Sequence, residues 1–263
     1  MMTRRDWPFF LGLALLGGVY AALILALLVA DIASTSPEHL LAALRVPEIR
    51  AALWLSLISS SAASILAVWV AVPLGYLLAR TRFPGRGLLG LLLEVPIVLP
   101  PLVVGLSLLI LCQSAPGRYL QGFVTITYAV PAVVLAQFAV AAAFATRTMR
   151  NTFEQLSPRT EEIARSLGCT RSMAFWRITL PESRRGILAA LTLAWARSIG
   201  EFGPVLIFAG VTRYRTEVLP TTVFLELSVG NVETAVAVSM LLIAVSGVVL
   251  GSVRLAFGPK ANV

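Results

Sequence analysis

Six long stretches of this chain carry almost no charge, and each is long enough to cross a lipid bilayer. An α-helix rises 1.5 Å per residue, so about 20 apolar residues cover the ~30 Å hydrocarbon layer. The stretches run over residues 7–30, 51–79, 87–117, 119–146, 186–212 and 234–253. The charged residues inside them are Glu94, Arg197 and Glu201. This pattern predicts a protein that lies in a membrane.

In a bilayer the backbone polar groups must find partners within the protein, and a helix provides them within one segment. We therefore predict an all-α polytopic protein with a single membrane domain over residues 1–263. Its six spans are expected at about 8–30, 51–79, 88–112, 124–149, 186–210 and 234–256. A soluble fold is excluded because only 13% of the residues are charged, about half the usual fraction. The first stretch exceeds the 7–15 apolar residues of a secretory signal, so we expect it to be retained.

The basic residues are distributed unevenly between the two sides of the predicted domain. Of the 21 lysines and arginines, 15 fall at the chain ends or in the loops after the second and fourth spans, 5 fall in the other loops, and Arg197 lies in a span. The positive-inside rule then places both termini and the loop over residues 151–182 in the cytoplasm. Nucleic-acid binding is not expected despite the net charge of +8, because the arginines are dispersed among loops.

The outer side retains two sizeable segments, residues 31–50 and 211–233. We expect a short helix over 38–44. His39 is the only histidine and has no second histidine or cysteine near it in sequence, so no metal site is predicted. Cys112 and Cys169 are predicted on opposite sides of the membrane, so we expect no disulfide between them.

The cytoplasmic loop has the features of two short helices joined by a glycine. Ser157 is a capping hydroxyl, and Pro158 follows it at the first helical position. Gly168 suits the left-handed residue that ends a helix. Thr170 can cap the second helix, and Pro181 is expected to stop it.

The first of these helices has an apolar face. Ile163 and Leu167 are four residues apart and therefore lie on the same side of a helix. An apolar face in the cytoplasm needs something to pack on. The membrane surface, the ends of the protein's own helices and a partner protein all satisfy this need, and periodicity alone does not choose among them.

The loop also resembles a family signature. Its spacing, Glu162-x-Ala164, then Gly168, then Ile178-x-Leu180-Pro181, resembles that of importer-type ABC permeases, in which a glutamate-alanine-alanine run precedes the glycine. Ile163 stands where that family has alanine. The resemblance implies that the helix before Gly168 is a coupling helix, seated in a cleft of a cytoplasmic ATPase. The coupling residues that it implies are Glu161, Glu162, Ile163, Ala164, Leu167 and Gly168.

A phosphate-binding loop requires Gly-Lys-Ser/Thr, and this chain does not contain it. Its only lysine, Lys260, lies between Pro259 and Ala261. We therefore expect no catalytic residue and no cofactor in this chain, with ATP and Mg bound by the partner ATPase.

Each charged residue within the spans is a candidate functional site, because a charge costs about 2.5–3.5 kcal/mol at a helix centre. Glu94 is expected to reach the cytoplasmic interface. Arg197 and Glu201 are four residues apart on one helix face. They form either an ion pair that holds the bundle together or a pair that lines a pathway, where Arg197 would attract an anion.

Prolines interrupt the third span. Pro96, Pro100 and Pro101 each remove a backbone donor, and a broken helix in a membrane must lie against protein or a cavity. The third span is therefore predicted to face the interior. The run over residues 200–204, with two glycines and a proline, predicts the same for the fifth.

These two runs carry a second, narrower resemblance. Leu99-Pro100-Pro101 and Arg197-Ser-Ile-Gly-Glu-Phe-Gly203 are similar to the molybdate, tungstate and sulfate branch of the ABC permeases, with Pro204 in place of the usual alanine. The pathway or gate residues that this implies are Pro100, Pro101, Arg197, Gly200, Glu201, Phe202 and Gly203.

Together the resemblances imply a type I ABC importer permease in a prokaryotic inner membrane, moving molybdate or tungstate. The partners implied are a second permease copy, an ATPase dimer and an extracytoplasmic oxyanion-binding protein. Sulfate or thiosulfate is the alternative cargo, although sulfate systems of this branch generally pair two different permeases. An ATP-independent secondary transporter is the rival class. An intramembrane enzyme is not expected, because the only histidine lies in an outer loop and the spans hold no paired carboxylates.

Overall fold

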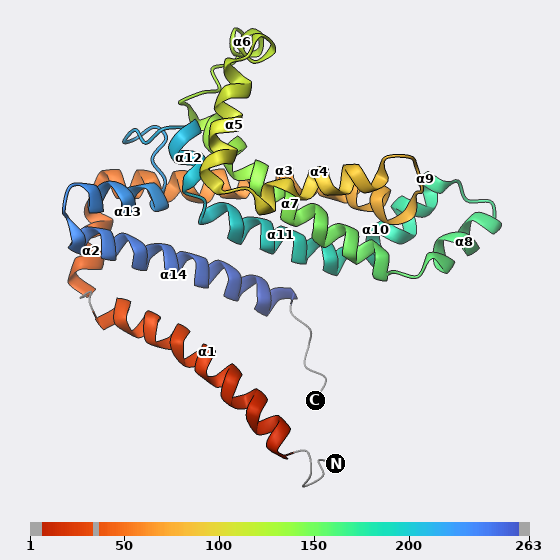
Figure 1. Ribbon diagram of the computed structural model, residues 1–263, viewed down its shortest axis with the longest axis horizontal. Helices are drawn as coiled ribbons and strands as arrows, with labels where there is room; N and C mark the ends of the chain where they lie inside the picture. The colour runs from red at the N-terminus through yellow and green to blue at the C-terminus, as the bar shows by residue number, and fades with distance from the viewer. Residues whose placement is uncertain (1–6, 34–36, 258–263) are drawn as a thin grey trace.

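The structure is a computed structural model that describes residues 7–33 and 37–257. These residues form helices joined by turns and loops (Figure 1), and no strand occurs among them, which confirms the all-α prediction. The helices are α1 (Trp7–Ala33), α2 (Pro37–Arg45), α3 (Pro47–Arg80), α4 (Arg86–Val98), α5 (Pro101–Gln113), α6 (Ala115–Gln121), α7 (Val130–Gln155), α8 (Pro158–Ser166), α9 (Arg171–Ala174), the π-helical turn η1 (Phe175–Thr179), α10 (Leu180–Glu182), α11 (Arg184–Ile199), α12 (Gly203–Phe208), α13 (Leu219–Ser228) and α14 (Val232–Phe257). Arg4, Arg5 and Lys260, which entered the topology argument, lie outside the described residues.

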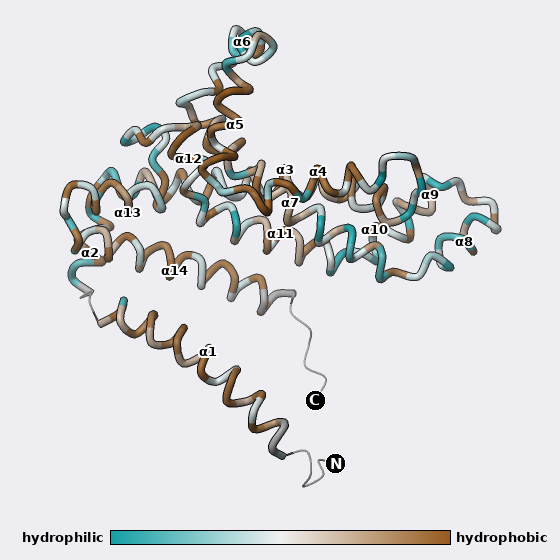
Figure 2. Tube along the Cα trace, in the orientation of Figure 1, coloured by the Kyte–Doolittle hydropathy of each residue, from teal (hydrophilic) through white to brown (hydrophobic). Residues whose placement is uncertain are grey.

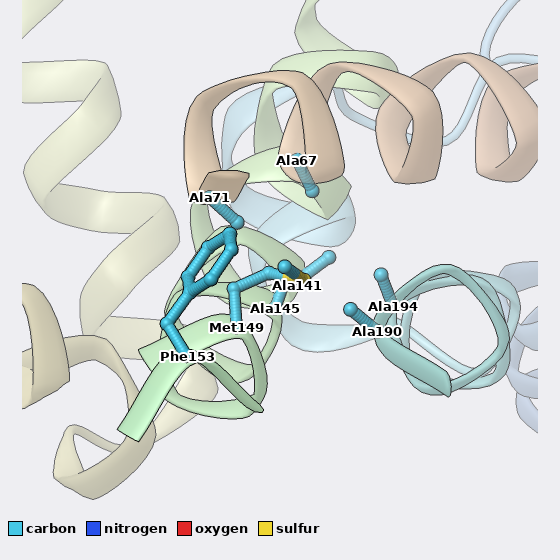
Figure 3. Close-up of a cluster of buried hydrophobic side chains, with 8 residues drawn as sticks. All are labelled: Ala67, Ala71, Ala141, Ala145, Met149, Phe153, Ala190 and Ala194. Carbon is cyan, nitrogen blue, oxygen red and sulfur yellow. The ribbon is translucent and has the colours of Figure 1, made fainter. Parts of the chain in front are cut away.

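The core of the bundle lies where α3, α7 and α11 pack against one another (Figures 1 and 3). Small side chains allow membrane helices to approach closely, and dispersion then stabilises the contact. Alanines from all three helices meet around Met149 and Phe153 of α7, which are fully buried. The buried set is Ala67, Ala71, Ala141, Ala145, Met149, Phe153, Ala190 and Ala194.

Among the described residues, four continuous helices are long and apolar enough to span a membrane, and they lie within α1, α3, α7 and α14. The pair α4 and α5 makes up to five, but it bends by 114°. The segment expected as the fifth span is divided into α11, of 16 residues, and α12. The count of six is therefore not confirmed as six continuous helices.

Proline explains both interruptions. The residue before a proline is pushed out of the α region, and Leu99 and Pro100 are accordingly extended, with ψ of 139° and 134°. In the second case Pro204 has no N–H to donate to the carbonyl of Gly200, four residues earlier. The chain leaves the helix at that point and resumes at α12.

Helix α1 lies apart from the bundle and approaches α14 (Figure 1). Figure 2 shows it as mostly hydrophobic along its length. Its apolar side chains, from Leu11 to Ile32, are exposed in the single chain. A helix that is apolar all round is expected to be covered by lipid or by another membrane helix.

Candidate functional site

The segment over residues 151–182, which was predicted to be cytoplasmic and is called the cytoplasmic segment below, has the predicted helix–glycine–helix form. The Ser157 hydroxyl accepts a hydrogen bond from the backbone N–H of Arg159 at 3.4 Å, where α8 begins. Gly168 has φ of +91°, a conformation that costs a residue with a Cβ about 1–2 kcal/mol. The Thr170 hydroxyl caps α9 by accepting from the N–H of Met173 at 3.2 Å.

The second helix does not stop at Pro181, so this expectation was wrong. The preceding turn widens into the π-helical turn η1, in which the N–H of Leu180 donates to the carbonyl of Phe175. A wider turn leaves room for the proline ring, which would otherwise meet the carbonyl of Arg177. The chain stays helical through α10 and turns only at Ser183.

The six predicted coupling residues divide between two faces of the segment. Ile163 and Leu167 are 59% and 81% exposed, and Glu162 and Gly168 are also exposed. Glu161 and Ala164 are instead buried against the rest of the protein. The outward face, Glu162, Ile163, Leu167 and Gly168, is thus an apolar and acidic surface open to a partner.

Glu161 attaches α8 to the bundle. The Tyr76 hydroxyl of α3 donates to Glu161 Oε1 at 2.6 Å. Thr179 donates to the other carboxyl oxygen at 3.5 Å, and Arg171 Nε lies 3.9 Å from Oε1. Sequence reasoning missed Tyr76 because it lies within an apolar span, where nothing in the local pattern distinguishes it.

The second predicted set, the pathway residues, lies elsewhere in the molecule, around α5 and α12 (Figure 1). These helices touch at backbone distance. A Cβ added to Gly203 would lie 3.1 Å from Cβ of Pro101, and one added to Gly105 would lie 2.7 Å from Cα of Pro204. The structure therefore brings together the two proline–glycine runs that the sequence singled out.

Arg197 and Glu201 form an ion pair of 2.8 Å between Nη1 and Oε2. Glu201 is 1% exposed. Its Oε2 atom contacts Arg197 as an ion pair but forms no hydrogen bond of good geometry among the described residues. The Arg197 side chain is 33% exposed, and its guanidinium lies 5.8 Å from the centre of the Phe144 ring. The buried carboxylate therefore has a charged partner, and the Arg197 side chain stays partly exposed in the single chain.

The remaining pathway residues are less enclosed. Phe202 is half-buried and its ring packs against Phe224 of α13, with centroids 5.3 Å apart. Pro100 and Gly200 are exposed. A Cβ on Gly200 would meet nothing closer than 3.9 Å, so this glycine is not required by packing within the chain.

Glu94 joins a charged cluster at the junction of α4 and α7. It lies 3.9 Å from Arg150, which also contacts Glu154 at 3.0 Å. Arg86 lies 3.8 Å from Glu154. A cavity of about 350 Å³ opens among these groups. Arg150 provides Glu94 with an oppositely charged partner, which reduces the cost of a charge inside a predicted span.

A further buried carboxyl lies in the segment over residues 211–233, which was predicted to be on the outer side. Glu217 is 2% exposed, and neither carboxyl oxygen has a hydrogen-bond partner among the described residues. Burial raises the pKa of Glu217, and the nearby Thr222 hydroxyl and Arg213 lower it by less. Next to it, the backbone N–H of Leu219 donates to Ser56 Oγ at 2.8 Å and ties the segment to α3.

The raised pKa of Glu217 makes stability depend on pH. The folded protein keeps this proton at a pH where an unfolded glutamate, with a pKa of about 4.3, has lost it, so stability falls as pH rises through the folded pKa. Glu217→Gln should therefore raise Tm at about pH 8 by about 2–4 °C, or about 1 kcal/mol, and change it less at about pH 5. Thermal unfolding in detergent measures this. Glu182→Gln, at an exposed position, is the control, and an equal gain at both pH values would contradict the assignment.

Comparison with known proteins gives matches over most of the chain. Residues 71–263 match the model of a family described as "Binding-protein-dependent transport system inner membrane component". The chain is 33% identical over 262 residues to the sulfate transport system permease protein CysT of Escherichia coli, covering 96% of this chain and 94% of the relative. It is 36% identical over 214 residues to the molybdenum transport system permease protein ModB of Mycobacterium tuberculosis, covering 80% of each.

The fold is similar to that of a solved structure. One chain in the crystal structure of a bacterial alginate ABC transporter, in complex with an alginate pentasaccharide-bound periplasmic protein, superposes with a TM-score of 0.77. The match covers 96% of this chain and 94% of that chain, at 16% identity. The likeness therefore concerns the fold alone, and it confirms the fold that the first resemblance implied.

Proposed function

Because the chain belongs to the family of binding-protein-dependent transport system inner membrane components, we propose that it is the permease subunit of an ABC importer that moves an oxyanion into the cytoplasm. The chain is the translocation subunit and not the ATPase. The contact of α5 with α12, beside the Arg197–Glu201 pair, carries the assignment of the pathway. This contact places the two interrupted helices beside Arg197, whose exposed side can attract an anion.

Molybdate or tungstate is the cargo that we favour, and sulfate is the second candidate. The molybdenum permease similarity and the Arg197-to-Gly203 motif support the first. The sulfate permease match, which covers 96% of the chain, supports the second. Uptake of radiolabelled molybdate into vesicles, competed with unlabelled tungstate or sulfate, decides between them. Competition by tungstate alone supports the favoured cargo, and competition by sulfate at equal concentration supports the alternative.

The exposed face of α8 and the family similarity support the partners that we propose. An ATPase dimer would bind the outward face of α8, and an extracytoplasmic binding protein would deliver the anion to the outer loops. Two copies of this chain would enclose the pathway, with both termini in the cytoplasm. ATP-driven closure would draw the two copies of α8 together and open the pathway outward. Hydrolysis would return it inward, by rigid-body motion about a fixed site.

The test of this arrangement is a change on the outward face of α8. Glu162→Lys reverses a charge in the proposed interface, where a like-charge contact costs several kcal/mol. Gly168→Asp strains the φ of +91°. We expect either variant to reach the membrane at normal levels and to lose transport. The amount of ATPase that co-purifies with it should fall about tenfold or more. Immunoblotting of membranes, co-purification and uptake measure the three quantities.

Glu182→Lys is the matched control, because it makes the same charge change at an exposed position in α10, outside α8. It should bind ATPase and transport as the unmodified protein does. If ATPase binding and transport both survive Glu162→Lys and Gly168→Asp, the coupling-helix assignment is wrong.

A further inference from the structure

Tyr76 occupies the point where the cytoplasmic segment meets the bundle. It lies near the cytoplasmic end of α3, and its ring makes edge contacts with Phe153 of α7 and Phe175 of η1, at centroid distances of 5.6 and 4.7 Å. Its hydroxyl donates to Glu161 Oε1 of α8 at 2.6 Å. One side chain therefore links two bundle helices to both parts of the cytoplasmic segment.

Glu161 is the counterpart of Tyr76 on α8. It is 7% exposed and lies on the face opposite the exposed Ile163 and Leu167. Oε2 accepts from the Thr179 hydroxyl at 3.5 Å, and Arg171 lies 3.9 Å from Oε1. The carboxylate thus points inward, so its role differs from that of the exposed Glu162.

A second set of bonds lies one helical turn farther along α3. Arg80 Nη2 donates to the carbonyl of Leu156, between α7 and α8, at 2.7 Å. Arg171 is the first residue of α9, which follows α8, and its Nη2 donates to the carbonyl of Arg80 at 3.3 Å. The end of α3 therefore holds the chain on both sides of α8.

The helix α8 itself packs mainly against α9 and η1, which belong to the same cytoplasmic segment. Among the side-chain hydrogen bonds given for the described residues, the Tyr76–Glu161 bond joins α8 directly to a long helix of the bundle. A short hydrogen bond to a partly buried charged group is among the stronger polar contacts in proteins. It transmits displacement because neither partner can move without breaking the bond or carrying the other with it.

We infer that Tyr76 and Glu161 form the joint through which movement of α8 is passed to α3 and the bundle, so that both are positioning residues for energy coupling. The inference rests on the proposed function, in which an ATPase moves α8. It adds that binding of the ATPase and transmission of its motion use different faces of α8. The outward face binds the ATPase, and the inward carboxylate of Glu161 transmits its motion to the bundle.

The key variant is Tyr76→Phe, which removes the hydroxyl and keeps the ring between Phe153 and Phe175. In the full-length permease it should raise amide exchange of α8 on the order of tenfold, the factor expected for losing a hydrogen bond to a charged group. In the complete importer it should keep ATPase binding and lower the transport per ATP hydrolysed several-fold. Hydrogen exchange followed by mass spectrometry, and paired uptake and hydrolysis assays, measure the two effects.

The matched control is Tyr119→Phe, which makes the same change on the exposed ring of α6 and should alter neither quantity. Glu161→Gln keeps an oxygen that accepts from Tyr76, so it should retain more coupling than Glu161→Ala. Adding Tyr76→Phe to Glu161→Ala should have little further effect, because the bond is already absent.

Each outcome decides the inference. Faster exchange of α8 together with a lower transport-to-hydrolysis ratio supports it. Unchanged exchange shows that the bond does not hold α8, and faster exchange with an unchanged ratio shows that the bond is structural only; either result overturns it. Failure of the proposed function is recognised separately, as normal ATPase binding and transport in Glu162→Lys, while the exchange measurement needs no ATPase.

Discussion

Replacement of Arg197 by methionine should destabilise the protein by about 3–5 kcal/mol, because it leaves the carboxyl of Glu201 buried without its cation. Glu201 is 1% exposed, and its 2.8 Å contact with Arg197 is the ion pair that the structure gives it. The variant should show a large loss of Tm in detergent and low levels in the membrane. Arg118→Met is the control, since it removes an arginine that is exposed in α6.

The double variant, Arg197→Met with Glu201→Gln, separates a structural from a pathway role. It removes both charges together, so most of the lost stability should return. If transport returns as well, the pair serves only to hold the bundle. We expect transport to stay impaired at recovered Tm, because the neutral pair no longer attracts an oxyanion. Uptake normalised to the amount of folded protein makes this comparison.

The second large effect is expected at the contact of α5 with α12. Gly105→Ala would place a Cβ 2.7 Å from Cα of Pro204, and backbone at that distance cannot yield without moving a helix. Overpacking of this kind costs about 1–3 kcal/mol. The displaced α12 follows directly after the Arg197–Glu201 pair. We therefore expect the proportional loss of transport to be larger than the loss of thermal stability explains. Thermal unfolding and uptake on the same preparation measure both.

Gly200→Ala is the matched control, because the nearest atom to its added Cβ is 3.9 Å away and its φ of −88° suits any residue. It should fold normally. Gly203→Ala, with contacts of 3.1 Å, should be intermediate between the two. An equal loss of Tm in the Gly105 and Gly200 variants would show that α5 and α12 do not pack as described.

The cytoplasmic segment shows which features can be predicted from neighbouring residues in the sequence. Its caps at Ser157 and Thr170 and its left-handed Gly168 are properties of neighbouring residues, and all three were predictable. The continuation past Pro181 was not predictable, because a proline permits either a stop or a widened turn. Phe175, the first residue of the widened turn, packs against Tyr76 of α3, which is distant in the chain.

The same division holds at the predicted pathway residues. Proline spacing predicted that the third and fifth spans would be interrupted, since a missing donor acts on residues within one turn. It did not predict that Gly105 would meet Pro204, or that Gly200 would be dispensable for packing. Those facts depend on which segments, distant in the chain, come to lie against each other.

The amino-acid sequence by itself determined the membrane class, the helical fold, the family signature in the cytoplasmic segment and the two proline–glycine runs. Each depends on composition or on spacing within a few turns of helix. Only the tertiary structure decided that Glu161 faces inward to Tyr76 while Glu162 faces outward. These adjacent carboxylates have the same chemistry in the chain. They differ because Tyr76, 85 residues from Glu161, covers one of them, and a contact of that range leaves no trace in local sequence.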